Sequence, residues 1–125
     1  MKKLMLAMAC LISTYAYALQ TGTYELWGSS HPTGEFNYRG EVCIAPQGEN
    51  YSLFWKIGNS NVQVGVGILR KDVLSVAYHD LSQNTDGVAS FCQISENVLE
   101  GKWTGFKSNT YGREYLVWKS PFIDF

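Results

Sequence analysis

The chain has 125 residues, of which 10 are Lys or Arg and 11 are Asp or Glu, so its formal net charge is −1 at neutral pH. This length suits a single domain. After Lys2–Lys3, the longest basic run is Arg70–Lys71. Because nucleic acids and anionic membranes attract clustered positive charge, the composition argues against both as partners.

The first 18 residues have the pattern of a secretory signal. Lys2 and Lys3 form a short cationic start, residues 4–12 are almost wholly apolar, and Ala16–Tyr17–Ala18 supplies the small residues that signal peptidase requires. The apolar run is too short to span a bilayer. We therefore expect residues 1–18 to be a signal peptide cleaved near Ala18, residues 19–125 to form one β-barrel domain, and the mature protein to be secreted or periplasmic in a bacterium.

Apolar and polar residues alternate with period two from residue 22 to residue 119, and no helical periodicity competes with that pattern. Turn residues interrupt the alternation at the spacing typical of β-sandwiches and β-barrels. The pattern predicts eight strands, at residues 23–28, 36–44, 51–57, 62–68, 73–78, 87–94, 98–104 and 113–119.

The predicted connections, such as 46–50, 58–61 and 80–86, are too short to contain a crossover helix. Consecutive hairpins make an up-and-down meander, and eight strands are enough to close on themselves and remove exposed edges. The predicted fold is therefore all-β, an eight-stranded antiparallel up-and-down meander closed into a small barrel. A two-sheet β-sandwich fits the same pattern and is the alternative.

Two cysteines follow the predicted signal, and an even number in an oxidising compartment suggests a disulfide. The alternation, however, puts Cys43 on the face opposite Val42 and Ile44, and Cys92 falls on the sixth strand. The second and sixth strands of a meander are not neighbours, so outward side chains on them cannot reach disulfide distance. We favour free thiols; a bridge would instead indicate a bulge or the sandwich.

Six short segments of the chain resemble a series found in small exported bacterial β-barrel proteins of unknown function, some of which carry a fibronectin-binding label. Residues 90–93 are more polar than that series. The plan is also similar, more distantly, to avidin-like and lipocalin-like barrels, although Tyr24 stands where lipocalins have the tryptophan of their G-x-W opening. These resemblances imply a fold rather than a ligand. The six segments are Tyr38–Gly40, Tyr51–Trp55, Gly65–Ile68, Leu74–Tyr78, Gly87–Ala89 and Leu99–Trp103.

Candidate catalytic and metal-binding residues are few. His79–Asp80 is the one adjacent His/Asp pair, but neighbours on a strand point to opposite faces, so Asp80 is poorly placed to orient His79. The histidines and cysteines after the signal lack metal-ligand spacing. We expect no catalytic residue, no metal and no cofactor. Three strand-borne glutamates, Glu41, Glu100 and Glu114, face a side that the pattern leaves open, and they could form exposed charge pairs or serve glycoside hydrolysis.

Aromatic side chains are the richest feature of the predicted strands. Facing inward, they either fill the barrel or line a cavity for a small apolar or planar ligand. We take Tyr38, Trp55, Tyr78 and Trp103 as the candidate ligand-binding residues.

The sequence thus favours an extracytoplasmic, non-enzymatic binding protein that uses its barrel for a small ligand or for contact with a host or envelope protein. One alternative is a secreted enzyme inhibitor acting through an exposed loop, at residues 29–34 or 107–112. A second is a small carboxylate-dependent hydrolase. The terminal Phe125 is common in outer-membrane barrels, but the strands are short and Pro121 ends the last one, so we expect no stable membrane insertion.

Overall fold

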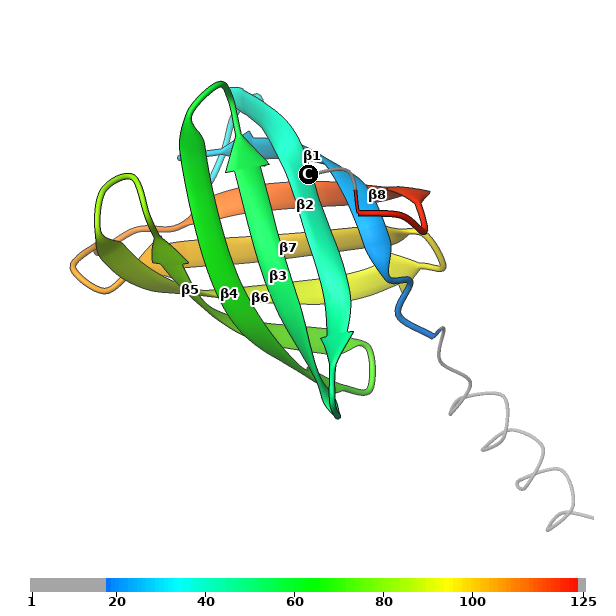
Figure 1. The fold of residues 1–125 in the computed structure, drawn as a ribbon. Helices are drawn as coiled ribbons and strands as arrows, with labels where there is room; N and C mark the ends of the chain where they lie inside the picture. Colours follow the sequence, from blue (N-terminus) through cyan, green and yellow to red (C-terminus); the bar gives the residue numbers. More distant parts are fainter. Residues whose placement is uncertain (1–17, 124–125) are drawn as a thin grey trace, which may run out of the picture.

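The computed structural model describes residues 18–123, so the predicted signal peptide, apart from Ala18, lies outside the described residues. Consecutive strands pair antiparallel and the last pairs with the first, which closes the barrel (Figure 1). The predicted eight-stranded up-and-down barrel is confirmed, and the sandwich alternative is wrong. The strands are β1 (Gly22–Ser29), β2 (Tyr38–Gln47), β3 (Asn50–Ile57), β4 (Asn61–Arg70), β5 (Val73–Asp80), β6 (Thr85–Ser95), β7 (Val98–Gly105) and β8 (Gly112–Ser120).

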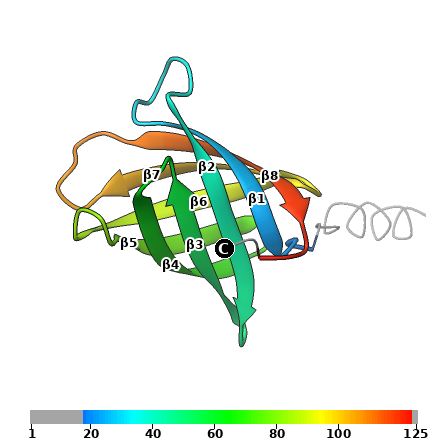
Figure 2. The same ribbon diagram turned by 45° about the horizontal axis from the view of Figure 1, so that its top comes forward.

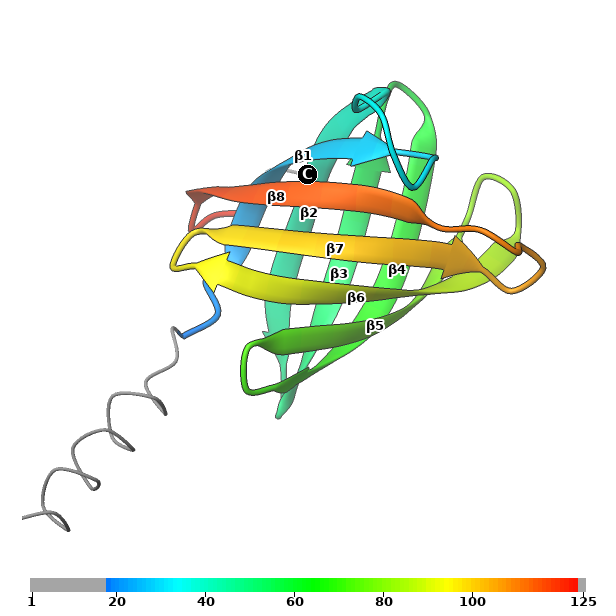
Figure 3. The same ribbon diagram turned by 180° about the vertical axis from the view of Figure 1, so that it is seen from behind.

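The alternation along each strand separates an inner from an outer face. On β2, Val42 and Ile44 are fully buried inside, whereas Arg39 points outward. Strands on the near and far walls run in crossing directions (Figures 1 and 3), as the tilt of a small closed barrel requires. The inward side chains form one core cluster of Tyr24, Leu26, Val42, Ile44, Leu53, Trp55, Leu74, Val76, Ala89, Phe91, Leu99 and Leu116.

Four inward-facing aromatic rings each lie over a glycine that is their direct partner on the neighbouring strand. The pairs are Tyr38 with Gly28, Tyr78 with Gly87, Phe91 with Gly101 and Trp103 with Gly112. A Cβ atom added at any of these glycines would overlap the ring opposite. The glycines therefore give the rings room to lie along the inner wall.

The two ends of the barrel differ. Four connections, at residues 30–37, 58–60, 81–84 and 106–111, surround one end, which we call the mouth, at the top and left of Figure 1; the 30–37 loop stands out beyond the strands in Figure 2. Three tight hairpins and the two ends of the described part of the chain, residues 18–21 and 121–123, surround the other, which we call the closed end. Within the described residues, no helix is long and apolar enough to cross a membrane.

The segment just before β1 covers the closed end. Leu19 packs against the core cluster. The Tyr24 hydroxyl donates to the Gln20 carbonyl oxygen at 2.6 Å, and Trp118 Nε1 donates to the Thr21 carbonyl oxygen at 3.1 Å. The polar ends of these two buried aromatics are thus satisfied by backbone, as burial requires.

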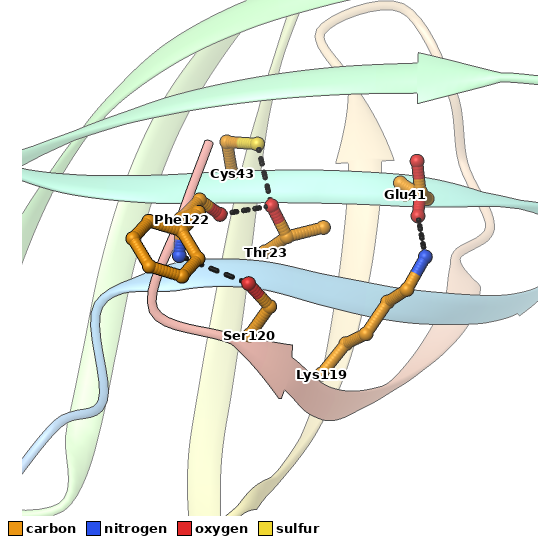
Figure 4. A network of polar contacts seen from close by, with 6 residues as sticks. All are labelled: Thr23, Glu41, Cys43, Lys119, Ser120 and Phe122. Atoms are coloured by element: carbon orange, nitrogen blue, oxygen red, sulfur yellow. Dashed lines mark hydrogen bonds and ion pairs between the residues drawn. The ribbon is translucent and has the colours of Figure 1, made fainter. Parts of the chain in front are cut away.

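Both described cysteines are free thiols, as the strand positions predict for a barrel. Cys92 is exposed, whereas Cys43, although outward-facing, is buried. The chain after β8 folds over it: Thr23 Oγ1 lies 3.4 Å from the Cys43 sulfur and donates to the Phe122 carbonyl oxygen at 2.5 Å (Figure 4). The C-terminal segment therefore shields a thiol that the alternation alone would expose.

Both boundaries of β2 differ from the prediction. The turn predicted to begin at Pro46 is shorter, because β2 continues to Gln47. The pairing of β2 with β1 ends at Ile44, so β1 has no residue opposite Pro46 that would need the N–H group that proline lacks. The start predicted at residue 36 is wrong in the other direction, since β2 begins at Tyr38.

The loop predicted at residues 80–86 is also shorter than expected. Strand β5 continues to Asp80 and β6 begins at Thr85. Asp80 Oδ1 accepts the backbone N–H groups of Ser82 and Gln83 at 2.8 and 3.0 Å, so the aspartate ends the strand and shapes the turn with its own side chain.

Candidate functional site

The mouth half of the barrel contains a cavity of about 690 Å³. All four candidate ligand-binding residues, Tyr38, Trp55, Tyr78 and Trp103, lie on its wall. The strands bring them together from β2, β3, β5 and β7, although up to 65 positions separate them in the sequence. That they bind a ligand stays a prediction. Other lining residues include Ile57, Asn61, Gln63, Asp80, Ala89 and Glu114.

Glu114 lies at the inner part of this cavity, on β8. Its two strand partners are glycines, Gly28 on β1 and Gly101 on β7. Because neither has a side chain, inward-facing residues on β2 and β3 can reach the carboxylate. The Tyr38 hydroxyl crosses over Gly28 and donates to Glu114 Oε2 at 2.7 Å, and Trp55 Nε1 donates to Oε1 at 3.3 Å.

Burial dominates the electrostatics of this carboxyl group. Glu114 is 5% exposed, and burial raises its pKa to about 7, while the hydrogen bonds from Tyr38 and Trp55 act in the opposite direction. Burial, and then the charge of Glu114, also raise the pKa of Tyr38 well above its ordinary value; Tyr78 is raised to about 12, again mainly by burial. Near neutral pH the two phenols are therefore neutral, and Glu114 is poised between its two protonation states.

A second carboxyl group, that of Asp80, lines the cavity wall, but its oxygens already accept hydrogen bonds from neighbouring residues of the fold. Its Oδ1 holds the 81–84 turn, and its Oδ2 accepts a hydrogen bond from Gln63 Nε2 at 3.1 Å. The side chain is almost fully buried. Asp80 therefore contributes negative charge to the cavity while its oxygens already have donors.

The cavity wall also combines the faces of aromatic rings with buried polar atoms that lack a hydrogen-bond partner. The Trp55 and Tyr78 ring centroids lie 6.1 Å apart at an interplanar angle of 59°. Trp103 Nε1 is buried without a hydrogen bond of good geometry, although the indole lies near enough to Tyr38 to lower the pKa of the phenol. Asn61 Oδ1 is likewise buried without a partner. Both atoms belong to cavity-lining residues and could pair with polar groups of a ligand.

Of the other residues considered from the sequence, Asp80 lines the cavity and the following side chains point away from it. Asp80 points inward and His79 outward, as expected for neighbours on a strand; His79 Nδ1 instead lies 2.8 Å from Asp86 Oδ1, its cross-strand partner. Glu41 faces outward and pairs with Lys119 at 2.9 Å. Glu100 is exposed. Among residues 18–123, no three His, Cys, Asp or Glu side chains gather as metal ligands would.

The loops suggested for enzyme inhibition lie at the mouth. Arg113 ties the 30–37 loop to β8, donating from Nε to the His31 carbonyl oxygen at 3.2 Å and from Nη2 to the Gly34 carbonyl oxygen at 2.5 Å. On the outer wall, a groove of about 530 Å³ is lined in part by the exposed side chains of Val66, Ile68 and Val88. That the outer face contacts another protein stays a prediction.

The position of Glu114 could have been found from the sequence. It shares its parity on β8 with Leu116 and Trp118, two large apolar residues that a strand should turn inward. Asp80 shares parity with Leu74, Val76 and Tyr78 in the same way. In both strands the signal is an acidic residue at one end of a series of alternate positions that are otherwise apolar and face inward.

Comparison with models of known protein families gives no match for this chain, and comparison with curated proteins gives none either. The geometry of the cavity is therefore the basis for the function proposed next.

Proposed function

We propose that this chain is a non-enzymatic binding protein that holds a small molecule in the mouth of its barrel. The observation that carries the proposal is the cavity of about 690 Å³. This volume lies within the range typical of small-molecule sites, and such sites combine apolar walls with a few placed polar groups.

The construction of the walls supports this proposal. The four aromatic residues and Glu114 are on strands, and the rings of Tyr38, Tyr78 and Trp103 lie directly over glycines of the neighbouring strands. A rigid, preformed site loses little conformational entropy when a ligand binds. Within the described residues, the core cluster packs the interior next to the cavity and shares Trp55 and Ala89 with its wall.

The signal-like pattern of residues 1–18 is the basis for a second element of the proposal, that binding takes place outside the cytoplasm. N-terminal sequencing of protein isolated from its own host would test it. We expect the mature chain to begin at Leu19; an intact Met1 start would refute export by this route.

Native mass spectrometry of protein purified from its own host tests the binding function. We expect an adduct of small-molecule mass in the wild-type protein. The Gly105→Leu variant should lose that adduct, because Gly105 lines the cavity and a Cβ there meets nothing closer than the Asp86 carbonyl oxygen at 3.8 Å, so leucine can occupy the mouth without distorting the wall.

Val88→Leu is the matched control, since Val88 is an outward-facing residue on β6 that is 45% exposed. It should keep the adduct. An adduct that survives in Gly105→Leu would place the ligand outside the cavity and contradict the proposal.

A carboxylate-dependent hydrolase is the second candidate, favoured by one observation, the raised pKa of buried Glu114. General-acid chemistry, however, commonly uses a second carboxylate that is free to act, and the oxygens of Asp80 already have donors in Ser82, Gln83 and Gln63. Recovery of a cleaved ligand after incubation with the protein would favour the hydrolase; recovery of the intact molecule favours binding.

A further inference from the structure

The charges facing the cavity are unbalanced. Among the described residues that line it, the inward-facing carboxyl side chains are those of Asp80 and Glu114, and the one basic residue is Lys107; Asp86 also lines it, but its carboxyl group lies on the outer face beside His79. Lys107 is exposed on the 106–111 loop, and Asp86 is already paired with His79. The inner wall therefore presents carboxyl groups that have hydrogen-bond donors but no cationic partner at hand.

The same wall presents aromatic rings to the cavity. The face of an aromatic ring carries partial negative charge and attracts a cation placed over it, most strongly when both are removed from water. Three of the rings are arranged around Glu114: Tyr38 and Trp55 bond to it, and Tyr78 lies 6.1 Å from Trp55 between ring centroids. A positively charged group in this space would meet ring faces and a carboxylate together.

We propose that the ligand is a small organic cation, an amine or quaternary ammonium compound, whose charged group lies among the cavity aromatics with the Glu114 carboxylate as its counter-ion. This inference rests on the proposed binding function. Anionic ligands are disfavoured because the one basic lining residue among those described, Lys107, is exposed on the 106–111 loop and not beside Glu114 on the inner wall. A neutral planar ligand would fit the walls but would leave the acidic excess without a partner.

Binding of a cation should change the protonation of Glu114. The titratable groups around Glu114 are the phenols of Tyr38 and Tyr78 and the carboxylate of Asp80, with Lys107 further out in the lining; the Asp86 carboxylate lies on the outer face beside His79. None of the inner groups is a cation that would hold Glu114 ionised. Entry of a cation should therefore lower the pKa of Glu114, so binding at pH 6 should release a proton and affinity should rise with pH until about 7.

Two matched probes test the inference on the purified protein. Benzyltrimethylammonium is the cation, and neopentylbenzene is its neutral isostere, with carbon in place of nitrogen. Following tryptophan fluorescence, we expect the cation to bind at least tenfold more tightly. Glu114→Gln should weaken cation binding at least tenfold and leave the isostere unchanged, whereas Glu41→Gln, on the outer face, should change neither.

A second measurement uses only the wild-type protein, so it does not depend on whether Glu114→Gln folds. Calorimetry at pH 6 in two buffers of different ionisation enthalpy should show that a proton is released when the cation binds. Equal affinity for the two probes would overturn the cation inference and leave the binding function standing. Absence of cation binding would also overturn the inference. If native mass spectrometry then found no small-molecule adduct either, the proposed function would fail with it.

Discussion

The closed end and the mouth of this barrel are built from the same alternating strands, yet they treat buried aromatic side chains differently. At the closed end, Tyr24 and Trp118 donate to backbone carbonyls of residues 20 and 21, and the surrounding space is filled. At the mouth, Tyr38 and Trp55 donate to a titratable side chain, Glu114, beside a cavity.

The difference separates stability from a binding site. A bond to a backbone carbonyl cannot change with pH and leaves nothing for a ligand. A bond to a buried carboxylate depends on its protonation and can be altered by a charged molecule nearby. The two ends are thus formed by the same strands, but the aromatic side chains of the closed end stabilise the fold, whereas those of the mouth surround a titratable carboxyl group.

The largest expected effect is on stability at the closed end. Phe91→Ala should lower the free energy of unfolding by about 3–5 kcal/mol, because it opens a dry cavity in the filled half. Tyr78→Ala at the mouth should cost no more than about 2 kcal/mol, since it enlarges a space that already exists. Urea denaturation measures both, and equal losses would contradict the division into two halves.

The next effect concerns the pH dependence of stability. The pKa of Glu114 is about 7 in the folded protein and close to 4.5 in the unfolded chain. Between these values the folded state binds more protons, so its free energy of unfolding should fall by up to about 3 kcal/mol as pH rises from 4.5 to 7 and level off above that.

Glu114→Gln removes this titration, so the urea midpoint of the variant should rise relative to that of the wild type as pH increases from 4.5 to 7. Glu41→Gln is the control for a general loss of acidic charge. A constant difference between Glu114→Gln and the wild type from pH 4.5 to 8 would show that Glu114 keeps an ordinary pKa.

A smaller effect tests the glycine that lets Tyr38 reach Glu114. Gly28→Ala places a methyl group against the Tyr38 ring, so we expect a loss of about 1–3 kcal/mol and weaker ligand binding. Gly105→Ala is the matched control, because a Cβ there has open space, and it should change stability by less than about 0.5 kcal/mol. Similar losses in both variants, measured by thermal unfolding, would indicate a general intolerance of alanine at the mouth.

The smallest effect is a difference in thiol reactivity that tests how the closed end is sealed from outside. In the folded protein, Cys92 should be alkylated quickly and Cys43 only after unfolding, because Thr23 and the segment containing Phe122 cover Cys43. Peptide mass spectrometry resolves the two sites. Fast labelling of Cys43 in the native state would show that the C-terminal segment does not shield it.

The sequence by itself determined the eight strands and favoured their meander order, because period-two alternation and short connections leave few other arrangements, but it left open which way Glu114 points. It also indicated the four aromatics that the structure places around one cavity, and the separation of Cys43 from Cys92. These properties follow from local pattern and connectivity.

Only the tertiary structure decided that the barrel is filled at one end and hollow at the other. Alternation shows that Tyr24 and Tyr38 both point inward, but not which one meets backbone and which meets a carboxylate. The contact between Tyr38 and Glu114 spans 76 positions and depends on Gly28 standing between them in the closed sheet. Ring closure brings β8 beside β1, and that long-range pairing, which no local pattern encodes, creates the site.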